Sequence, residues 1–178
     1  CIRDSNNRLR SIPPEIGNLQ NLTVLHLSGN GITKLPAEIG QLVNLEALHL
    51  ENASLFDIPA EIGNLTNLRA LYFTTGSVST ISAALGDMTN MEILSLKSNH
   101  LSIIPPVVLQ LYRLRELDLS DNNIVEIPPE IQHVERIERF DRSGNQLTHV
   151  PKELGSRSSL KVLDLSNNHW ISIPSEIG

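Results

Sequence analysis

The sequence predicts an α/β fold, a right-handed solenoid of about eight repeats, and three observations support it. Leucine occurs 28 times and isoleucine 18 times among the 178 residues, whereas aromatic residues make up only 3%. Within each repeat, alternation such as Leu25-His26-Leu27 predicts a short strand with one buried face. An aliphatic column recurs every 23 residues without insertion or deletion, at Leu22, Leu45, Leu68, Met91, Leu114, Ile137 and Leu160.

A turn follows each predicted strand, and asparagine dominates one inward position of that turn. This position holds Asn7, Asn30, Asn99, Asn122, Asn145 and Asn168. A buried turn leaves backbone donors and acceptors unpaired, and a side-chain amide can satisfy both kinds. We therefore expect a ladder of stacked asparagines inside the solenoid, weakened where Ala53 and Gly76 take the asparagine position.

The remainder of each repeat predicts a short helical or 3-10 segment on the convex side. An aliphatic residue and a proline lead it, as in Leu35-Pro36, and proline suits the first turn of a helix. A glutamate two residues later, such as Glu38, lies near the helix N-terminus, where negative charge is favoured. Strands stack about 4.8 Å apart and helices are wider, so the array curves into a horseshoe with parallel strands on its concave face.

Composition and charge argue against several classes of function. The net charge of −6 and the pI near 5.5 argue against nucleic-acid binding, which needs a basic face. No apolar run approaches the roughly 18 residues of a membrane helix, so we expect no membrane insertion by this segment. The sequence has no Gly-rich phosphate loop, no G-x-S-x-G, no H-E-x-x-H and no CxxC pair. We expect no catalytic residue, no cofactor and no metal, and Cys1 has no argued role.

The repeat L-x-x-L-x-L-x-x-N-x-L-x-x-I/L-P-x-E-I-G-x-L-x-N resembles that of leucine-rich repeat proteins over essentially the whole chain. Its 23-residue length and I/L-P-x-E-I segment are similar to intracellular Ras-group, Scribble- and Erbin-like and Roco-type arrays. Plant receptor kinases of the family usually carry glycine before I-P, where this chain has Lys34, Asp57 and Ile103 in three of its repeats. The resemblance implies one leucine-rich repeat domain over residues 1–178, a fragment of a longer array without its caps, in the cytoplasm.

The resemblance also implies a function in recognition rather than catalysis. We expect a protein–protein recognition module or scaffold in signalling, with a protein or peptide as its partner. Two alternatives remain. One is the ligand-sensing ectodomain or sensor region of a receptor. The other is the substrate-recognition array of a kinase, Roco GTPase or ubiquitin ligase whose catalytic part lies outside this chain.

The concave strand positions are the candidate binding residues, because they form a rigid, repeated, solvent-facing surface. They are Arg3, His26, His49, Glu51, Tyr72, Thr74, Ser95, Lys97, Asp118, Asp141 and Asp164. Three aspartates in adjacent strands predict carboxylates about 5 Å apart. This row favours a partner with a basic segment facing the C-terminal half.

Three further features break or extend the pattern. His26, His49 and Glu51 share one face and supply zinc-ligand types, but a complete ligand set is not evident, so we expect ordinary recognition residues. Phe73 and Gly76 make the repeat at residues 68–90 the most irregular one. Arg142 occupies an inward strand position, and we expect its stem to pack while its guanidinium reaches solvent.

Overall fold

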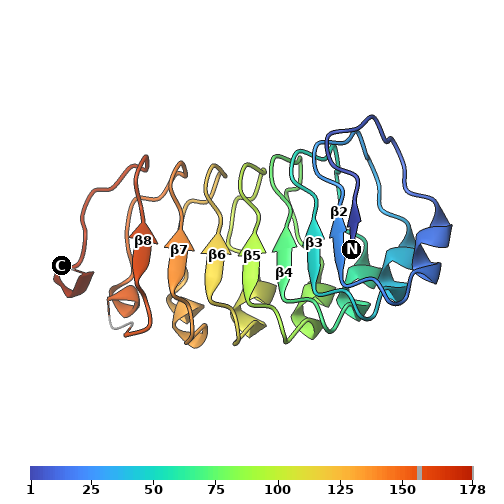
Figure 1. The fold of residues 1–178 in the computed structure, drawn as a ribbon. Helices are drawn as coiled ribbons and strands as arrows, with labels where there is room; N and C mark the ends of the chain where they lie inside the picture. Colours follow the sequence, from blue (N-terminus) through green and yellow to red (C-terminus); the bar gives the residue numbers. More distant parts are fainter. Residues whose placement is uncertain (156–157, 178) are drawn as a thin grey trace.

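The computed structural model of the protein describes residues 1–155 and 158–177. Within these residues, eight short parallel strands form one open sheet, and their order in the sheet follows their order in the chain (Figure 1). They are β1 (Ile2–Arg3), β2 (Val24–His26), β3 (Ala47–His49), β4 (Ala70–Tyr72), β5 (Ile93–Ser95), β6 (Glu116–Asp118), β7 (Arg139–Asp141) and β8 (Val162–Asp164). Leu25 pairs with Leu48, 23 residues later, so the sheet register is the repeat register. The predicted α/β solenoid is confirmed.

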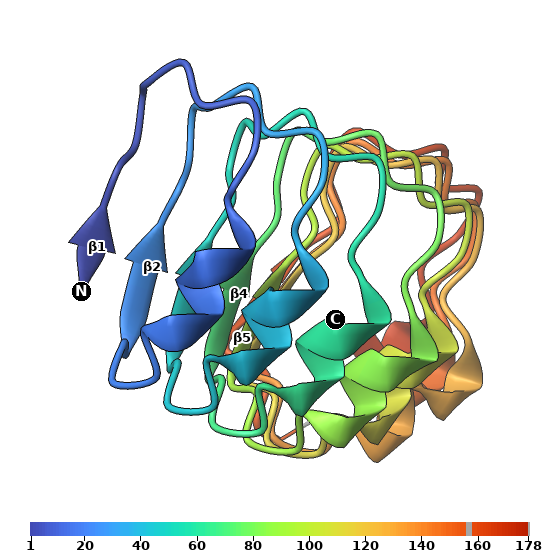
Figure 2. The ribbon, with the colours of Figure 1, turned by 90° about the vertical axis from the view of Figure 1, so that its right-hand side faces the viewer.

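In the same described residues, a 3-10 helix follows each strand and lies across the core from the sheet (Figure 2). These helices are η1 (Pro14–Asn18), η2 (Ala37–Gln41), η3 (Ala60–Asn64), η4 (Ala83–Asp87), η5 (Pro106–Gln110), η6 (Pro129–His133), η7 (Lys152–Leu154) and η8 (Ser175–Ile177). Pro36, in extended conformation, directly precedes η2, and Glu38 lies in its first turn. Each helix has at most five residues, a length that suits the tighter 3-10 form.

Glycine near the end of these helices allows adjacent repeats to approach closely. A Cβ atom on Gly40 would lie 2.5 Å from the carbonyl oxygen of Glu61 in the next repeat. A Cβ atom on Gly63 would lie equally close, 2.5 Å, to the carbonyl oxygen of Ala84. A larger residue at either position would push the helices apart, because the interior is close-packed. Glycine therefore determines how tightly these convex segments stack.

The asparagine ladder is present in the core and joins consecutive repeats. The Asn122 side-chain oxygen Oδ1 accepts a hydrogen bond from the Leu101 backbone amide at 3.0 Å. The Asn122 side-chain nitrogen Nδ2 donates to the backbone carbonyls of Leu96 and Leu119 at 3.0 and 3.1 Å. Equivalent bonds are made by Asn30, Asn99, Asn145 and Asn168. Because Leu96 and Leu101 belong to the preceding repeat, each asparagine satisfies backbone groups of two repeats at once.

The irregular fourth repeat, residues 68–90, contains a matched change in volume. Phe73 occupies an inward leucine position and is fully buried. Gly76 occupies the asparagine position, where a Cβ atom would lie 3.2 Å from the Phe73 ring and 2.7 Å from the Asn99 side-chain oxygen Oδ1. The missing side chain at residue 76 thus makes room for the larger ring at residue 73.

The prediction that the Arg142 guanidinium reaches solvent is wrong. Arg142 is 0% exposed, and in the described chain none of its three guanidinium nitrogens has a hydrogen-bond partner. Its guanidinium carbon lies 3.8 Å from the centroid of the Phe140 ring, a cation–π contact. Burial lowers the pKa of Arg142 well below its ordinary value. The side chain has no route to water because it points into the core and the next repeat stacks over it, with Asn168 bonded to the Arg142 carbonyl.

Candidate functional site

The outward residues of the strands form rows along the solenoid, because side chains alternate between the two faces of a sheet. The central row supplies one residue from each of β1 to β8, and the strand register aligns its members. It consists of Arg3, His26, His49, Tyr72, Ser95, Asp118, Asp141 and Asp164. Ser95 is nearly covered at 7% exposure, whereas the other seven are half-buried or exposed.

The remaining predicted binding residues lie beside this central row. Glu51, Thr74 and Lys97 each follow a member of the row by two residues, just beyond β3, β4 and β5. Glu51 and Thr74 are half-buried, and Lys97 is exposed. The Lys97 ammonium pairs with the Asp121 carboxylate at 3.4 Å.

Three rings of the central row form a continuous stack. The His26 and His49 rings have centroids 4.1 Å apart and planes 20° apart. The Tyr72 ring follows, with its centroid 4.6 Å from that of His49 and its plane 13° from it. The ring spacing is close to the strand spacing of about 4.8 Å, so the sheet itself holds the rings in contact. We call these three residues the aromatic stack.

Glu51 is the carboxylate next to the aromatic stack. It accepts a hydrogen bond from the Ser28 hydroxyl, and one of its oxygens lies 3.3 Å from His49 Nδ1. Burial raises the pKa of Glu51, but hydrogen bonds from Ser28, from its own backbone amide and from His49 together outweigh burial and leave the pKa below its ordinary value. The pKa of His26 is also lowered, by burial and then by the nearby His49 and Arg3. The stack therefore favours neutral His26 beside an ionised Glu51.

The histidine pair does not present a metal site. Stacked rings direct their nitrogen lone pairs side by side, whereas a metal needs lone pairs that converge on one point. Within residues 1–155 and 158–177, no group of three histidine, cysteine, aspartate or glutamate side chains is arranged to hold a metal ion.

The aspartates of the central row each have a local structural role that the sequence analysis missed. The Asp118 carboxylate accepts hydrogen bonds from the Ser120 amide at 3.0 Å and the Ser120 hydroxyl at 2.6 Å. Asp141 with Ser143 and Asp164 with Ser166 repeat this arrangement. These bonds lower the pKa of Asp164. The recurring Asp-x-Ser sequence could have revealed the role. Each aspartate uses its Oδ1 in this way, and Asp118 Oδ2 also accepts a bond from the Ser95 hydroxyl at 3.3 Å.

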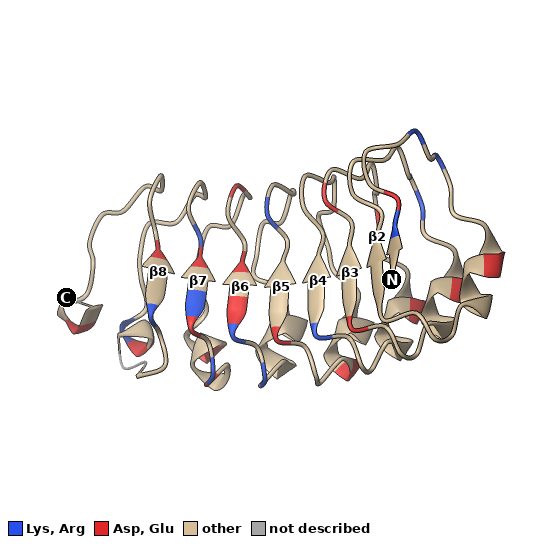
Figure 3. Ribbon diagram, in the orientation of Figure 1, with Lys and Arg blue, Asp and Glu red and all other residues tan. Residues whose placement is uncertain are grey.

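Charge divides the strand face into two halves. Strands β2 to β5 carry no charged residue, whereas β6, β7 and β8 each carry an aspartate, joined by Glu116 and Arg139 (Figure 3). Some nearby charges cancel, since Glu138 pairs with Arg115 at 2.6 Å and with Lys161 at 2.7 Å. The aspartate row is therefore the main net charge on the strands of the C-terminal half.

A second outward row, the floor row, was also missed by the sequence analysis. It contains the first residue of each strand from β2 to β8: Val24, Ala47, Ala70, Ile93, Glu116, Arg139 and Val162. Its first four members are uncharged and half-buried. Together with the aromatic stack they leave strands β2 to β5 without a lysine, arginine, aspartate or glutamate on this face. The signal for this row was available, because four successive repeats place an uncharged residue two positions before the central row.

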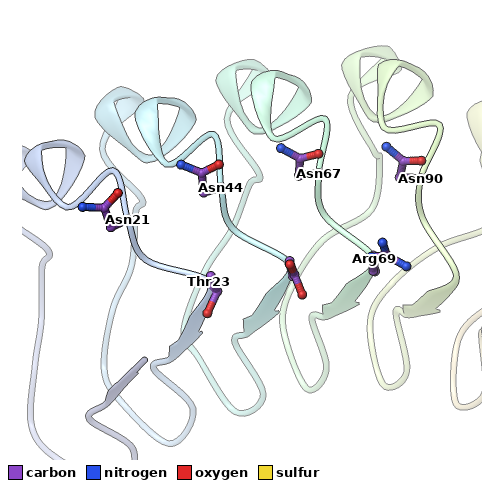
Figure 4. Close-up of a pocket in the computed structure, with 7 residues that line it drawn as sticks. Asn21, Thr23, Asn44, Asn67, Arg69 and Asn90 are labelled. Atoms are coloured by element: carbon purple, nitrogen blue, oxygen red, sulfur yellow. The ribbon is translucent and has the colours of Figure 1, made fainter.

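A polar groove runs along the edge of the sheet, where the chain enters β2 to β5 (Figure 4). Its volume is about 340 Å³. It is lined by Asn21, Thr23, Asn44, Glu46, Asn67, Arg69 and Asn90. The Asn44, Asn67 and Asn90 amides donate to carbonyls 24 residues earlier in the chain, at 2.8 to 2.9 Å. These bonds tie neighbouring repeats together, so these three asparagines have a structural role.

The described residues contain no helix long and apolar enough to span a membrane. No curated protein matches the chain significantly. A family model described as leucine-rich repeat region matches residues 2–104, and a model described as leucine rich repeat matches residues 89–147 and 112–169. Leucine-rich repeats are typically non-catalytic binding modules.

Several solved structures share the fold. A leucine-rich repeat protein of Leptospira interrogans is 37% identical with a TM-score of 0.94, over 97% of this chain and 44% of that protein. The plant peptide hormone receptor RGFR1 in complex with RGF2 is 32% identical with a TM-score of 0.82, over 95% of this chain and 28% of the receptor. A third structure is the ectodomain of the Arabidopsis thaliana receptor kinase GASSHO1/SCHENGEN3 in complex with CASPARIAN STRIP INTEGRITY FACTOR 2. It is 36% identical with a TM-score of 0.83, over 93% of this chain and 21% of the ectodomain chain. This chain thus spans less than half of each relative. It belongs to the leucine-rich repeat family.

Proposed function

We propose that the chain is a non-catalytic recognition module that binds a protein or peptide on its concave strand face, in a signalling protein. The observation that carries this proposal is the central row, in which side chains from eight strands are aligned by the sheet register. Such a surface is rigid before binding, so a partner loses little affinity to ordering it. The likeness to RGFR1, a plant peptide hormone receptor, supports a peptide as one kind of partner.

The two halves of the face suit different parts of a partner. The aromatic stack and the uncharged floor row suit apolar or aromatic side chains. The aspartate row suits a basic segment, because carboxylates steer and pair with Arg and Lys. We therefore propose an elongated partner that lies across the strands, with apolar residues over β2 to β5 and basic residues over β6 to β8.

The compartment and the parent protein are part of the same proposal. A cytoplasmic scaffold is favoured by the lack of glycine before I-P, where Lys34, Asp57 and Ile103 stand in three repeats. A receptor sensor is the second candidate, favoured by the likeness to plant receptor ectodomains. The sequence of the parent protein outside these residues would distinguish the candidates. A membrane-spanning segment there would indicate the receptor, and a catalytic domain would indicate the enzyme-linked array.

The test begins with selection of binding peptides from a displayed random library against the chain. Individual peptides are then titrated against concave variants His49→Ala, Tyr72→Ala and the double variant Asp118→Asn with Asp141→Asn. We expect each to weaken binding by about tenfold, a size typical of interface residues, while circular dichroism shows an intact fold. The double variant should also flatten the salt dependence of affinity.

The convex variants Glu38→Ala and Glu130→Ala are the matched controls. Both glutamates lie in the first turn of a 3-10 helix, so their role is local and their replacement should leave affinity unchanged. Loss of affinity in these controls, with the concave variants unaffected, would place the interface on the convex side.

A further inference from the structure

We propose that a second groove at the edge of the sheet binds a phosphate group of the partner, held by Arg113 and Arg136. This inference rests on the proposed function, because it adds one chemical requirement to the partner of the same module. The groove has a volume of about 440 Å³ and lies where the chain enters β5 to β8, an edge marked by basic residues below β6 and β7 (Figure 3). It is lined by Glu92, Arg113, Arg115, Glu135, Arg136, Glu138 and Ser159.

The two arginines occupy a repeat position that has a structural role in other repeats. The position directly precedes the aliphatic column and holds Asn21, Asn44, Asn67, Asn90, Arg113, Arg136 and Ser159. Three of these asparagines donate to a backbone carbonyl 24 residues earlier, and the Ser159 hydroxyl donates in the same way to the Glu135 carbonyl at 2.9 Å. Within the described residues, Arg113 and Arg136 make no such bond. Two consecutive repeats thus lack a stabilising contact and carry like charges instead.

The carboxylates on the strand side of the groove are already paired. Glu92 accepts a hydrogen bond from Arg69 at 3.0 Å. Glu138 accepts bonds from Arg115 at 2.6 Å and from Lys161 at 2.7 Å. The bonds from Lys161 and Arg115 lower the pKa of Glu138, so this carboxylate stays ionised and bound to them. Neither glutamate is therefore free to neutralise Arg113 or Arg136.

Arg113 and Arg136 have no carboxylate partner in the described part of the chain. Both side chains are exposed, and Arg113 Nη1 donates only to the neutral Asn90 side-chain oxygen, at 2.7 Å. They stand in consecutive repeats, which are spaced about 4.8 Å apart at the strands, so their charges repel. Glu135, the third carboxylate of the groove, offsets one of the two charges at most. With Arg69 and Lys161 at its sides, five basic residues face three acidic ones, which leaves two positive charges.

A phosphate group matches this arrangement better than a carboxylate does. It carries a charge near −2 at pH 7 and three acceptor oxygens, so it can bind two guanidinium groups at once. A carboxylate has one charge and two oxygens, which suit a single arginine. Nucleic acid is disfavoured, because the net charge of −6 and the aspartate row repel a polyanion. We therefore identify the occupant as a phosphorylated side chain of a peptide or protein partner.

The test is an NMR titration at low ionic strength with a capped peptide that carries phosphoserine between two glycines on each side. Two matched peptides carry glutamate or serine in the central position. We expect saturable shifts of the Arg113 and Arg136 side-chain signals with the phosphoserine peptide. The glutamate peptide should bind about fivefold more weakly, and the serine peptide should cause no shift at these signals.

Replacement of either arginine by asparagine locates the site. Arg113→Asn and Arg136→Asn should each weaken the phosphoserine peptide by about fivefold or more, because each removes one guanidinium. Asparagine can form the carbonyl bond that this position makes in other repeats, so the melting temperature should not fall. Arg139→Asn is the matched control. It removes the same charge from the strand face of the same repeat, outside the groove, and should bind as the parent chain does.

Three results would overturn the phosphate site. The first is equal binding of the glutamate and phosphoserine peptides. The second is an equal loss of affinity in Arg139→Asn, which would show that only overall charge matters. The third is tighter binding of a short oligothymidylate than of the phosphoserine peptide, which would assign the groove to nucleic acid.

The result also separates the groove from the function on which it rests. If library-selected peptides depend on Tyr72 and the phosphoserine peptide does not bind at the arginines, the groove is wrong and the proposed function stands. If the phosphoserine peptide binds at the arginines and no selected peptide depends on the concave residues, the phosphate site stands and the concave interface fails.

Discussion

The two halves of the solenoid differ both inside and outside, although they share one backbone register. Outside, β2 to β4 carry the aromatic stack, whereas β6 to β8 carry the aspartate row. Inside, the N-terminal half loses the asparagine ladder at Ala53 and Gly76. In the C-terminal half the ladder is continuous from Asn99 to Asn168.

The halves also differ in how they accommodate a phenylalanine in the core. In the N-terminal half, Phe73 is matched by the empty volume at Gly76. In the C-terminal half, Phe140 contacts Arg142, whose nitrogens have no hydrogen-bond partner in the described chain. An inward leucine position of the repeat thus accommodates a phenylalanine well when a neighbouring position has no side chain. A buried charge is compensated only in part by the ring beside it.

The largest effect should come from Arg142→Leu, which removes the uncompensated charge. Leucine occupies the equivalent positions Leu119 and Leu165, so the backbone already suits it. We expect the free energy of unfolding to rise by about 2 kcal/mol and the melting temperature by about 6 °C, measured by calorimetry. Arg139→Leu, on the same strand but exposed, is the control and should change stability by less than about 0.5 kcal/mol. A lower melting temperature for Arg142→Leu would show that the guanidinium is stabilising.

A smaller effect of opposite sign should come from Gly76→Asn. The new side chain would collide with the Phe73 ring and the Asn99 side-chain amide, and we expect this overpacking to cost about 1 kcal/mol. Adding Phe73→Leu should recover stability in this background, since it restores the leucine and asparagine of the regular repeat. Phe73→Leu alone should be destabilising, because it leaves a cavity. A double-mutant cycle measured by urea unfolding tests this reversal, and additive effects would contradict it.

The smallest effect should be a change of folding stability with pH that arises in and beside the aromatic stack. Because the pKa of His26 is lowered in the folded chain, the unfolded chain binds the proton more tightly. The stability should therefore fall as pH decreases through about 6.5, the ordinary histidine value. Glu51, whose pKa is also lowered, should add a further loss of stability near pH 4. Urea unfolding at pH 8 and pH 5.5 should show a smaller difference for His26→Gln than for the parent chain.

His133→Gln supplies the comparison for that measurement. His133 lies at the end of η6, outside the aromatic stack. An identical pH response in both variants would show that the stack does not determine it.

The repeat architecture and the residues of the central row were predictable from sequence. Leu25, His26 and Leu27 show why: alternation assigns each side chain to a face, and the 23-residue step assigns each strand to its neighbours. The ladder was predictable for the same reason, since Asn122 has one chemical role in every repeat that contains it. These features depend on local geometry repeated along the chain.

Other features were decided only in three dimensions. The stacking of His26, His49 and Tyr72, the fit of Phe73 to Gly76 and the burial of Arg142 each depend on side-chain positions in the packed array. A periodic pattern states which face a residue occupies, but not whether its ring meets the next ring or its charge meets a partner. The contacts between repeats join residues about 23 positions apart, so rotamers and close packing between repeats determined them.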